Sequence, residues 1–187
     1  MKFEEDGERI EDLRLILSRV AYAATLFDDD GISLRFMNRP SPGQPLPQLD
    51  NITNESQITQ LIGQRGQEGA IKFQGLTPLG TQLQEQVLEP LVLSRARARA
   101  LRKPVLIITI TDGQPAGESR STLRDKIQYT MDQFRSTPEL GRKPVAFQFA
   151  QVGNDQAARN FLAELDADPA VGPLIDCTSS EYKVCTR

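Results

Sequence analysis

The chain of 187 residues contains no histidine and no tryptophan, and its only cysteines are Cys177 and Cys185. Without histidine, Ser-His-Asp and Cys-His catalysis are excluded, because both need an imidazole base. A zinc site is disfavoured, since zinc takes about four nitrogen, sulfur or oxygen ligands and soft ligands are scarce here. Any bound metal is therefore expected to be a hard cation with oxygen ligands.

Long apolar runs and an excess of basic charge are absent as well. The most apolar stretch, residues 105–110, is too short to span a bilayer. The first residues are acidic and no apolar segment follows them, so we expect no secretory signal. The net charge is −3, which disfavours a nucleic-acid partner. These features predict a cytoplasmic protein with free thiols and with neither a membrane nor a nucleic-acid partner.

The spacing of apolar residues predicts the helices. Intervals of three and four along residues 10–27 indicate an amphipathic helix. Shorter helices are expected at 55–63, 121–134 and 154–166. A long helix is expected over 78–103, with Pro78 at its first position. Pro90 should kink or split this helix, and Pro104 should end it.

Four segments have the pattern of strands: residues 32–37, 105–111, 145–152 and 174–177. Residues 105–111 show little alternation, which is typical of a central parallel strand buried on both faces. The proline-rich segment 38–50 is expected to be a loop, and 70–73 a brief extended stretch. Alternating helices and strands predict an α/β fold: one domain over 1–187, with helices on both faces of a mostly parallel sheet.

Two residues are candidates for a functional site. Asp112 directly follows strand 105–111, and ligands in open α/β sheets bind beyond the carboxyl ends of strands. It could be a metal ligand or a catalytic carboxylate, and a plain Asp-Gly turn is equally open. Thr77, in the sequence Gly-Leu-Thr-Pro-Leu-Gly-Thr, precedes the long helix. Capping that helix is its default role, and its hydroxyl could also coordinate a cation.

Other motifs favour ordinary structural roles. Residues 75–81 lack the Walker and G-x-G-x-x-G patterns of nucleotide binding. Residues 117–121 come within one residue of the G-x-S-x-G nucleophile elbow, but no histidine can activate Ser119. Residues 28–31 do not fit a calcium loop, because their glycine comes too early. The basic residues at 95–103 carry no interleaved aromatics and indicate a solvated helix end.

Taken together, residues 26–32, 32–37, 75–81 and 108–113 resemble a von Willebrand factor type A (vWA) domain of the intracellular stand-alone type. Order, spacing and sequence agree over essentially the whole chain. The resemblance implies a Rossmann-like three-layer sandwich with a metal-ion-dependent adhesion site at the top of its sheet. In such domains the ligands are an Asp-x-Ser-x-Ser motif after the first strand, a Thr and an Asp. Thr77 and Asp112 match the last two, and Mg²⁺ is the implied ion.

The Asp-x-Ser-x-Ser motif itself does not occur in this sequence. Residues 1–10 resemble the acidic lead that follows the motif in related proteins. The expectation is therefore a vWA domain without its first central strand and without the ligands of that motif, so that Mg²⁺ is held weakly. Strands 32–37 and 105–111 should then be separated by a gap or should pair directly.

The leading hypothesis is a non-enzymatic protein–protein interaction module of vWA type with an incomplete metal-ion-dependent adhesion site. Two alternatives stay open. The chain could be an α/β hydrolase-like or phosphotransfer enzyme that uses Asp112. It could also be a fragment of a longer vWA protein with no function of its own.

Overall fold

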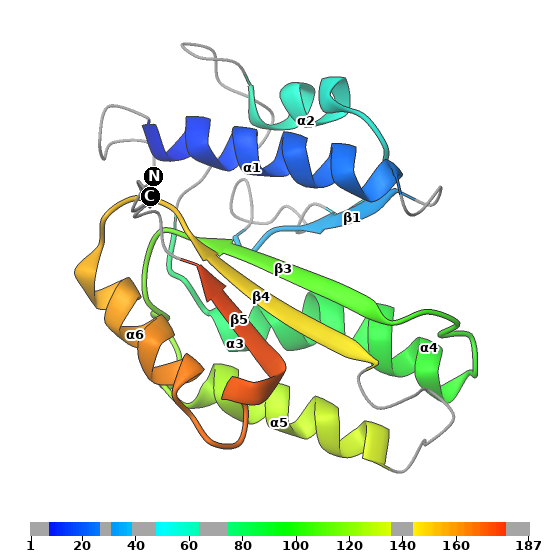
Figure 1. Ribbon diagram of the computed structural model, residues 1–187, viewed down its shortest axis with the longest axis vertical. Coiled ribbons are helices and arrows are strands. Elements are labelled where there is room, and N and C mark those ends of the chain that lie inside the picture. Colours follow the sequence, from blue (N-terminus) through cyan, green and yellow to red (C-terminus); the bar gives the residue numbers. More distant parts are fainter. Residues whose placement is uncertain (1–7, 27–30, 39–47, 64–74, 136–143, 179–187) are drawn as a thin grey trace, which may run out of the picture. The chain divides into compact units, whose positions relative to one another are not determined.

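The computed structural model describes residues 8–26, 31–38, 48–63, 75–135 and 144–178 (Figure 1). The chain divides into two compact units, Met1–Leu76 and Thr77–Arg187. No helix within the described ranges is long and apolar enough to cross a membrane.

The first unit combines two helices with a two-stranded sheet. Its elements are α1 (Glu8–Thr25), β1 (Ile32–Arg35), β2 (Gln48–Ile52) and α2 (Glu55–Ile62). The helix predicted over 10–27 is confirmed as α1, which buries Leu13, Leu17 and Ala21 on one face. β1 and β2 pair antiparallel, with an irregularity between Ile32 and Leu34.

Helix α2 matches the prediction for residues 55–63, and its first turn explains why it starts there. The backbone N–H of Gln57 donates to Asn54 Oδ1 over 3.1 Å, and the backbone N–H of Asn54 donates to Gln57 Oε1 over 3.2 Å. This reciprocal capping box satisfies amides that the helix itself leaves without partners. Ile58 and Ile62 form the buried face of the helix.

The prediction of a loop over 38–50 is wrong at its end, where residues from Gln48 onward form β2. The last proline of the segment 38–50 is Pro47. The strand begins directly after it, because from there on every residue of the segment has a backbone N–H to donate. Arg35 in β1 secures the pair, because its guanidinium donates to Leu49 O over 3.1 Å and to Asp50 Oδ1 over 2.9 Å. Residues 39–47 and the extended stretch expected at 70–73 lie outside the described residues.

The second unit contains a parallel sheet, as the sequence predicts, but it is built from three of the four predicted strands, because strand 32–37 pairs with β2 in the first unit. β3 (Val105–Thr111), β4 (Val145–Gln151) and β5 (Ile175–Thr178) lie in the order β3-β4-β5. The register runs from Val105 opposite Val145 to Thr111 opposite Gln151. Because the strands are parallel, their carboxyl ends meet at one edge, where the arrowheads gather in Figure 1.

The position predicted for strand 105–111 is wrong, because β4 occupies the centre of the described sheet and β3 an edge. β3 is also not buried on both faces, since Leu106 is 60% exposed. Burial is concentrated on the other face, where Phe147 and Phe149 of β4 are covered. Two outcomes are expected for strands 32–37 and 105–111, a gap or direct pairing. Among the described residues they do not pair with each other: β1 pairs with β2, and β3 pairs with β4.

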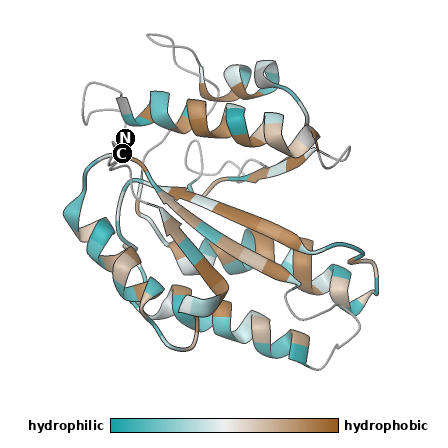
Figure 2. Cartoon of the chain, in the orientation of Figure 1, coloured by the Kyte–Doolittle hydropathy of each residue, from teal (hydrophilic) through white to brown (hydrophobic). Residues whose placement is uncertain are grey.

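Helices flank this sheet. α5 (Thr122–Arg135) buries Leu123, Ile127 and Phe134, and α6 (Gln156–Asp166) packs against β4 and β5. The helix predicted over 154–166 is confirmed as α6, whose buried face consists of Ala158, Phe161, Leu162 and Leu165. The short 3₁₀ helix η4 (Gly172–Leu174) leads into β5. Figure 2 shows the apolar residues gathered in the strands of the sheet.

The predicted long helix is shorter and differently built. It runs through α3 (Leu79–Leu83), the π-helical η2 (Gln84–Leu93) and α4 (Ser94–Arg97). Of the two effects expected of Pro90, a kink or a split, the split does not occur: Pro90 lies inside η2, whose wider π-helical turns accommodate a residue without an N–H donor. The helix ends at Arg97 and not at Lys103. Arg99 takes a left-handed conformation with φ of 55°, and Ala100 N donates back to Arg95 O over 2.8 Å.

Candidate functional site

Asp112 lies where the sequence places it, directly after β3 at the carboxyl edge of the parallel sheet. Thr111 fixes the start of the following loop. Its Oγ1 donates to Gly113 O over 2.9 Å and accepts from Gly113 N over 3.3 Å. Thr111 O accepts from Val152 N over 2.9 Å, which ties the same point to β4. Asp112 therefore projects from a well-anchored turn and is half-buried.

Thr77 lies on a segment that touches the loop after Asp112. Thr77 O accepts from Ala116 N over 2.9 Å and from Leu79 N over 2.8 Å. The structure thus brings together the two segments that carry the predicted site residues, although they are far apart in sequence. The default capping role expected for Thr77 is wrong. Pro78 occupies the N-cap position of α3, and the cap residue makes no side-chain hydrogen bond.

Glu118 supplies the missing cap, and sequence analysis did not single it out. Its Oε1 accepts from Gly80 N over 2.7 Å. Its Oε2 accepts from Thr81 N over 2.9 Å and from Thr81 Oγ1 over 2.8 Å. A carboxylate at this place also complements the positive end of the helix dipole. Glu118 precedes a different helix in the sequence, so no local pattern could have assigned it to α3.

Gly80 allows α3 and α5 to come together at this point. A Cβ atom at residue 80 would lie 2.5 Å from the backbone nitrogen of Leu123 and 2.7 Å from its Cα. Real Cβ atoms essentially never approach backbone so closely. The sequence therefore needs glycine here to let the first turns of both helices meet.

The far side of the loop is attached to α6 by Arg120. Arg120 Nε and Nη2 donate to Glu164 Oε2 over 3.1 and 2.7 Å. Its Nη1 donates to Gln114 Oε1 over 3.3 Å. The guanidinium also lies 5.5 Å from the ring centre of Phe161. These groups are exposed except Phe161, so we expect the ion pair to contribute little to the stability of the fold.

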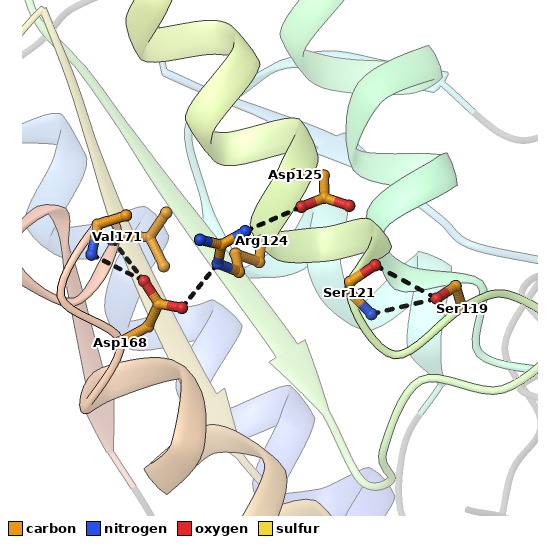
Figure 3. A network of polar contacts seen from close by, with 7 residues as sticks. Ser119, Ser121, Arg124, Asp125, Asp168 and Val171 are labelled. Atoms are coloured by element: carbon orange, nitrogen blue, oxygen red, sulfur yellow. Dashed lines mark hydrogen bonds and ion pairs between the residues drawn. The ribbon is translucent and has the colours of Figure 1, made fainter.

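A second polar cluster, shown in Figure 3, fastens α5 to the turn after α6. Arg124 Nε donates to Asp168 Oδ2 over 2.7 Å. Asp168 Oδ1 accepts from the backbone amides of Ala170 and Val171 over 2.8 and 3.2 Å. The amide of Ala170 and the guanidinium of Arg124 hold the pKa of Asp168 below its ordinary value.

The serines of the imperfect nucleophile elbow interact with each other. Ser119 Oγ and Ser121 Oγ are 3.3 Å apart, and Ser121 N donates to Ser119 Oγ over 3.4 Å (Figure 3). Both serines are exposed at the start of α5. This arrangement is a polar loop leading into a helix, and it gives no activation to Ser119.

Gln151 is a buried polar residue at the same edge of the sheet, opposite Thr111, and only 3% of it is exposed. Its Nε2 donates to Asp155 O over 2.8 Å. Because a backbone carbonyl only accepts hydrogen bonds, the side-chain atom that faces it must be the amide nitrogen. Its Oε1 is buried without a hydrogen-bond partner in the described part of the chain. Asp155 in turn caps α6 by accepting from Ala158 N over 2.6 Å.

The donors at this edge fit a hard cation in type, and they do not complete its coordination. The hydroxyl of Thr77 and the carboxylate of Asp112 offer the oxygen ligands that Mg²⁺ prefers. Glu118 is already bonded to Gly80 and Thr81. Among the described residues, no group of three or more His, Cys, Asp or Glu side chains could hold a metal.

Cys177 in β5 is a free thiol. Partial burial, together with the negative charges of Asp166 and Asp176, raises the pKa of this thiol to about 12. It therefore stays protonated and weakly nucleophilic at neutral pH. Cys185 lies outside the described residues.

Comparisons of this chain with known proteins find no matching family model, no matching curated protein and no matching solved structure.

Proposed function

We propose that this protein is a vWA-type protein–protein interaction module in the cytoplasm, with an incomplete metal-ion-dependent adhesion site that holds Mg²⁺ weakly. The observation that supports this most directly is the hydrogen bond from Ala116 N to Thr77 O, 2.9 Å long. It joins the two segments that would carry the remaining ligands, Thr77 and Asp112. Thr77 and Asp112 both belong to the unit with the parallel sheet.

The location also favours binding. Asp112 lies at the carboxyl edge of a parallel sheet, where open α/β folds bind their ligands. The loop after it is anchored at Thr111, at Glu118 and at Arg120. An anchored loop loses little conformational entropy when a partner docks on it.

Weak Mg²⁺ binding follows from the donor set. Mg²⁺ takes six oxygen ligands and is often held by one or two carboxylates, with water in the other positions. Asp112 and Thr77 would hold the ion, which would supply a positive charge able to attract a carboxylate of the partner. With one carboxylate we expect a dissociation constant on the order of 1 mM.

We propose binding without catalysis because the groups most often used for acid–base and nucleophilic catalysis are missing or inactive here. No histidine exists to serve as a base, and Ser119 interacts with Ser121 in an exposed loop. A serine nucleophile needs an adjacent base to activate it.

Affinity capture from an extract, using the full chain, tests this proposal. Three forms are compared, each with Mg²⁺ and with EDTA: the unchanged chain, Asp112→Asn and Asp176→Asn. Asp176 is the matched control, because it is an exposed aspartate in β5. Proteins retained by the unchanged chain are then purified and their dissociation constants measured against all three forms.

The proposal predicts at least one partner whose affinity falls about tenfold or more with Asp112→Asn and with EDTA, but not with Asp176→Asn. A partner that binds all forms equally would contradict a role for Asp112. Turnover of a substrate that stops with Asp112→Asn would favour the enzymatic alternative.

A further inference from the structure

The carboxylate of Glu118 connects two distant stretches of the second unit. It accepts three hydrogen bonds from the first turn of α3: from Gly80 N at 2.7 Å, Thr81 N at 2.9 Å and Thr81 Oγ1 at 2.8 Å. Glu118 itself belongs to the loop between β3 and α5. Hydrogen bonds to an ionised acceptor are about twice as strong as those between neutral groups, so this is a firm connection.

The loop that Glu118 ends is the one that Asp112 begins. Its first residues are fixed at Thr111, whose hydroxyl exchanges hydrogen bonds with Gly113 at 2.9 and 3.3 Å. Its last residues are fixed at Glu118. Between these anchors, Ala116 N donates to Thr77 O over 2.9 Å. The contact between the Thr77 segment and the Asp112 loop therefore lies next to the Glu118 connection.

Gly80 lets the first turn of α3 lie close to the first turn of α5, the helix that follows the loop. Its Cα faces the backbone of Leu123 so closely that an added Cβ would lie 2.5 Å from the Leu123 nitrogen. The start of α3 consequently has little room to shift against the start of α5. The carboxylate of Glu118, at the end of the loop, fixes the position of the loop relative to the start of α3.

We propose that Glu118 is a positioning residue of the candidate site: it holds the Asp112 loop against the Thr77 segment, so that both candidate ligands are presented together. The expected effect on Mg²⁺ binding rests on the proposed function. The role of Glu118 in holding the loop against the Thr77 segment does not. The hydrogen bonds of Glu118 connect the loop to α3. Asp112 lies on the same loop and Thr77 directly precedes α3, so their positions depend on this connection.

A helix cap with no further role is the competing explanation, and Ala116 separates the two. Ala116 N bonds to Thr77 O and not to Glu118. If Glu118 only caps α3, its loss should expose the amides of Gly80 and Thr81 and leave that of Ala116 unchanged. If Glu118 positions the loop, the amide of Ala116 should lose protection as well.

Amide hydrogen exchange by NMR, on the full chain without added metal, measures this directly. Glu118→Ala is expected to speed exchange about tenfold or more at Gly80, Thr81 and Ala116. Asp155→Ala is the matched control, because Asp155 caps α6 through Ala158 N at 2.6 Å. The control should affect the start of α6 and leave Ala116 unchanged. Unchanged exchange at Ala116 in Glu118→Ala would overturn the proposal.

A milder pair of variants covers the case in which Glu118→Ala does not fold. Thr81→Val removes the hydroxyl that donates to Glu118 Oε2, and Thr81→Ser keeps it. We expect faster exchange at Ala116 in Thr81→Val and wild-type exchange in Thr81→Ser. Equal exchange in both would overturn the proposal.

Calorimetric titration with MgCl₂ tests the consequence for the site. If the unchanged chain binds Mg²⁺, Glu118→Ala should weaken binding about tenfold, whereas Asp155→Ala should not. Equal affinity in Glu118→Ala and the unchanged chain would contradict the positioning role. If the unchanged chain gives no heat, the proposed metal site fails, and the exchange of Ala116 still decides the role of Glu118.

Discussion

Replacing Gly80 with alanine should weaken the junction between α3 and α5. In the folded protein the new Cβ would lie 2.5 Å from Leu123 N, 2.7 Å from Leu123 Cα and 2.8 Å from Thr122 C. All three are backbone atoms of the start of α5. A side chain could rotate out of the way, but these atoms move only if one helix shifts against the other.

Two effects of opposite sign determine how much Gly80→Ala changes the free energy of unfolding. Alanine has a helix propensity better than glycine by about 0.8–1.0 kcal/mol, which alone would stabilise α3. Overpacking typically costs about 1–3 kcal/mol, and a clash with backbone belongs in the upper part of that range. The clash outweighs the propensity, and we expect the free energy of unfolding to fall by about 1–2 kcal/mol.

Urea denaturation followed by circular dichroism measures this change, and Gly113→Ala is the matched control. A Cβ at Gly113 would meet no heavy atom within 4 Å. That variant should change the free energy of unfolding by no more than about 0.5 kcal/mol. If Gly80→Ala were as stable as the unchanged protein, or more stable, the close approach of α3 and α5 would be refuted.

Three further predictions concern the core and the titrating groups. Phe149→Ala should lower the free energy of unfolding by about 3–5 kcal/mol, because the ring is fully buried in the central strand. Chemical denaturation measures this change, and a loss below about 1 kcal/mol would contradict the burial. Asp168→Asn should destabilise the protein at neutral pH, and its difference in stability from the unchanged protein should vanish as pH falls through the lowered pKa of Asp168. Melting temperatures of the two proteins, measured from pH 7 to 2, should therefore converge. A constant difference between them would count against the ion pair. Cys177 should react with iodoacetamide much more slowly in the folded than in the denatured chain, as followed by peptide mapping, and equal rates would exclude the raised pKa. Because the thiol pKa is raised to about 12, its contribution to stability should hold at neutral pH and decline as pH rises from the ordinary thiol range toward that value.

Much of the fold follows from local sequence signals. The faces of α1 and α6 could be predicted because their apolar residues recur at helical spacing and one face packs against the rest of its unit. β3 and β4 could be predicted as strands because their apolar runs are too short for helices and follow prolines.

The position of β3 in the sheet could not be predicted in the same way. A continuous apolar run indicates burial, but it does not say how many neighbours a strand has. Leu106 has the composition of a core residue and is 60% exposed, because β3 forms an edge of the described sheet. The strand β2 was missed for a related reason, since its pairing with β1 outweighs the weak strand propensity of Gln48–Ile52.

The same difference between local signals and long-range contacts applies to the candidate site. Asp112 could be located from sequence, because a turn after a buried strand has a fixed place in an α/β fold. Glu118 could not, since its partners Gly80 and Thr81 lie 38 and 37 residues away in the chain. Only the packing of α3 against α5 brings them into contact.

The most direct measurement of the central claim is an NMR titration of the isotope-labelled full chain with MgCl₂. If Thr77 and Asp112 hold the ion, amide shifts at residues 77 and 112–116 should change saturably, with a midpoint on the order of 1 mM, and Asp112→Asn should abolish the change. Shifts that stay unchanged up to about 20 mM Mg²⁺, or that move only at residues away from these two segments, would contradict the account.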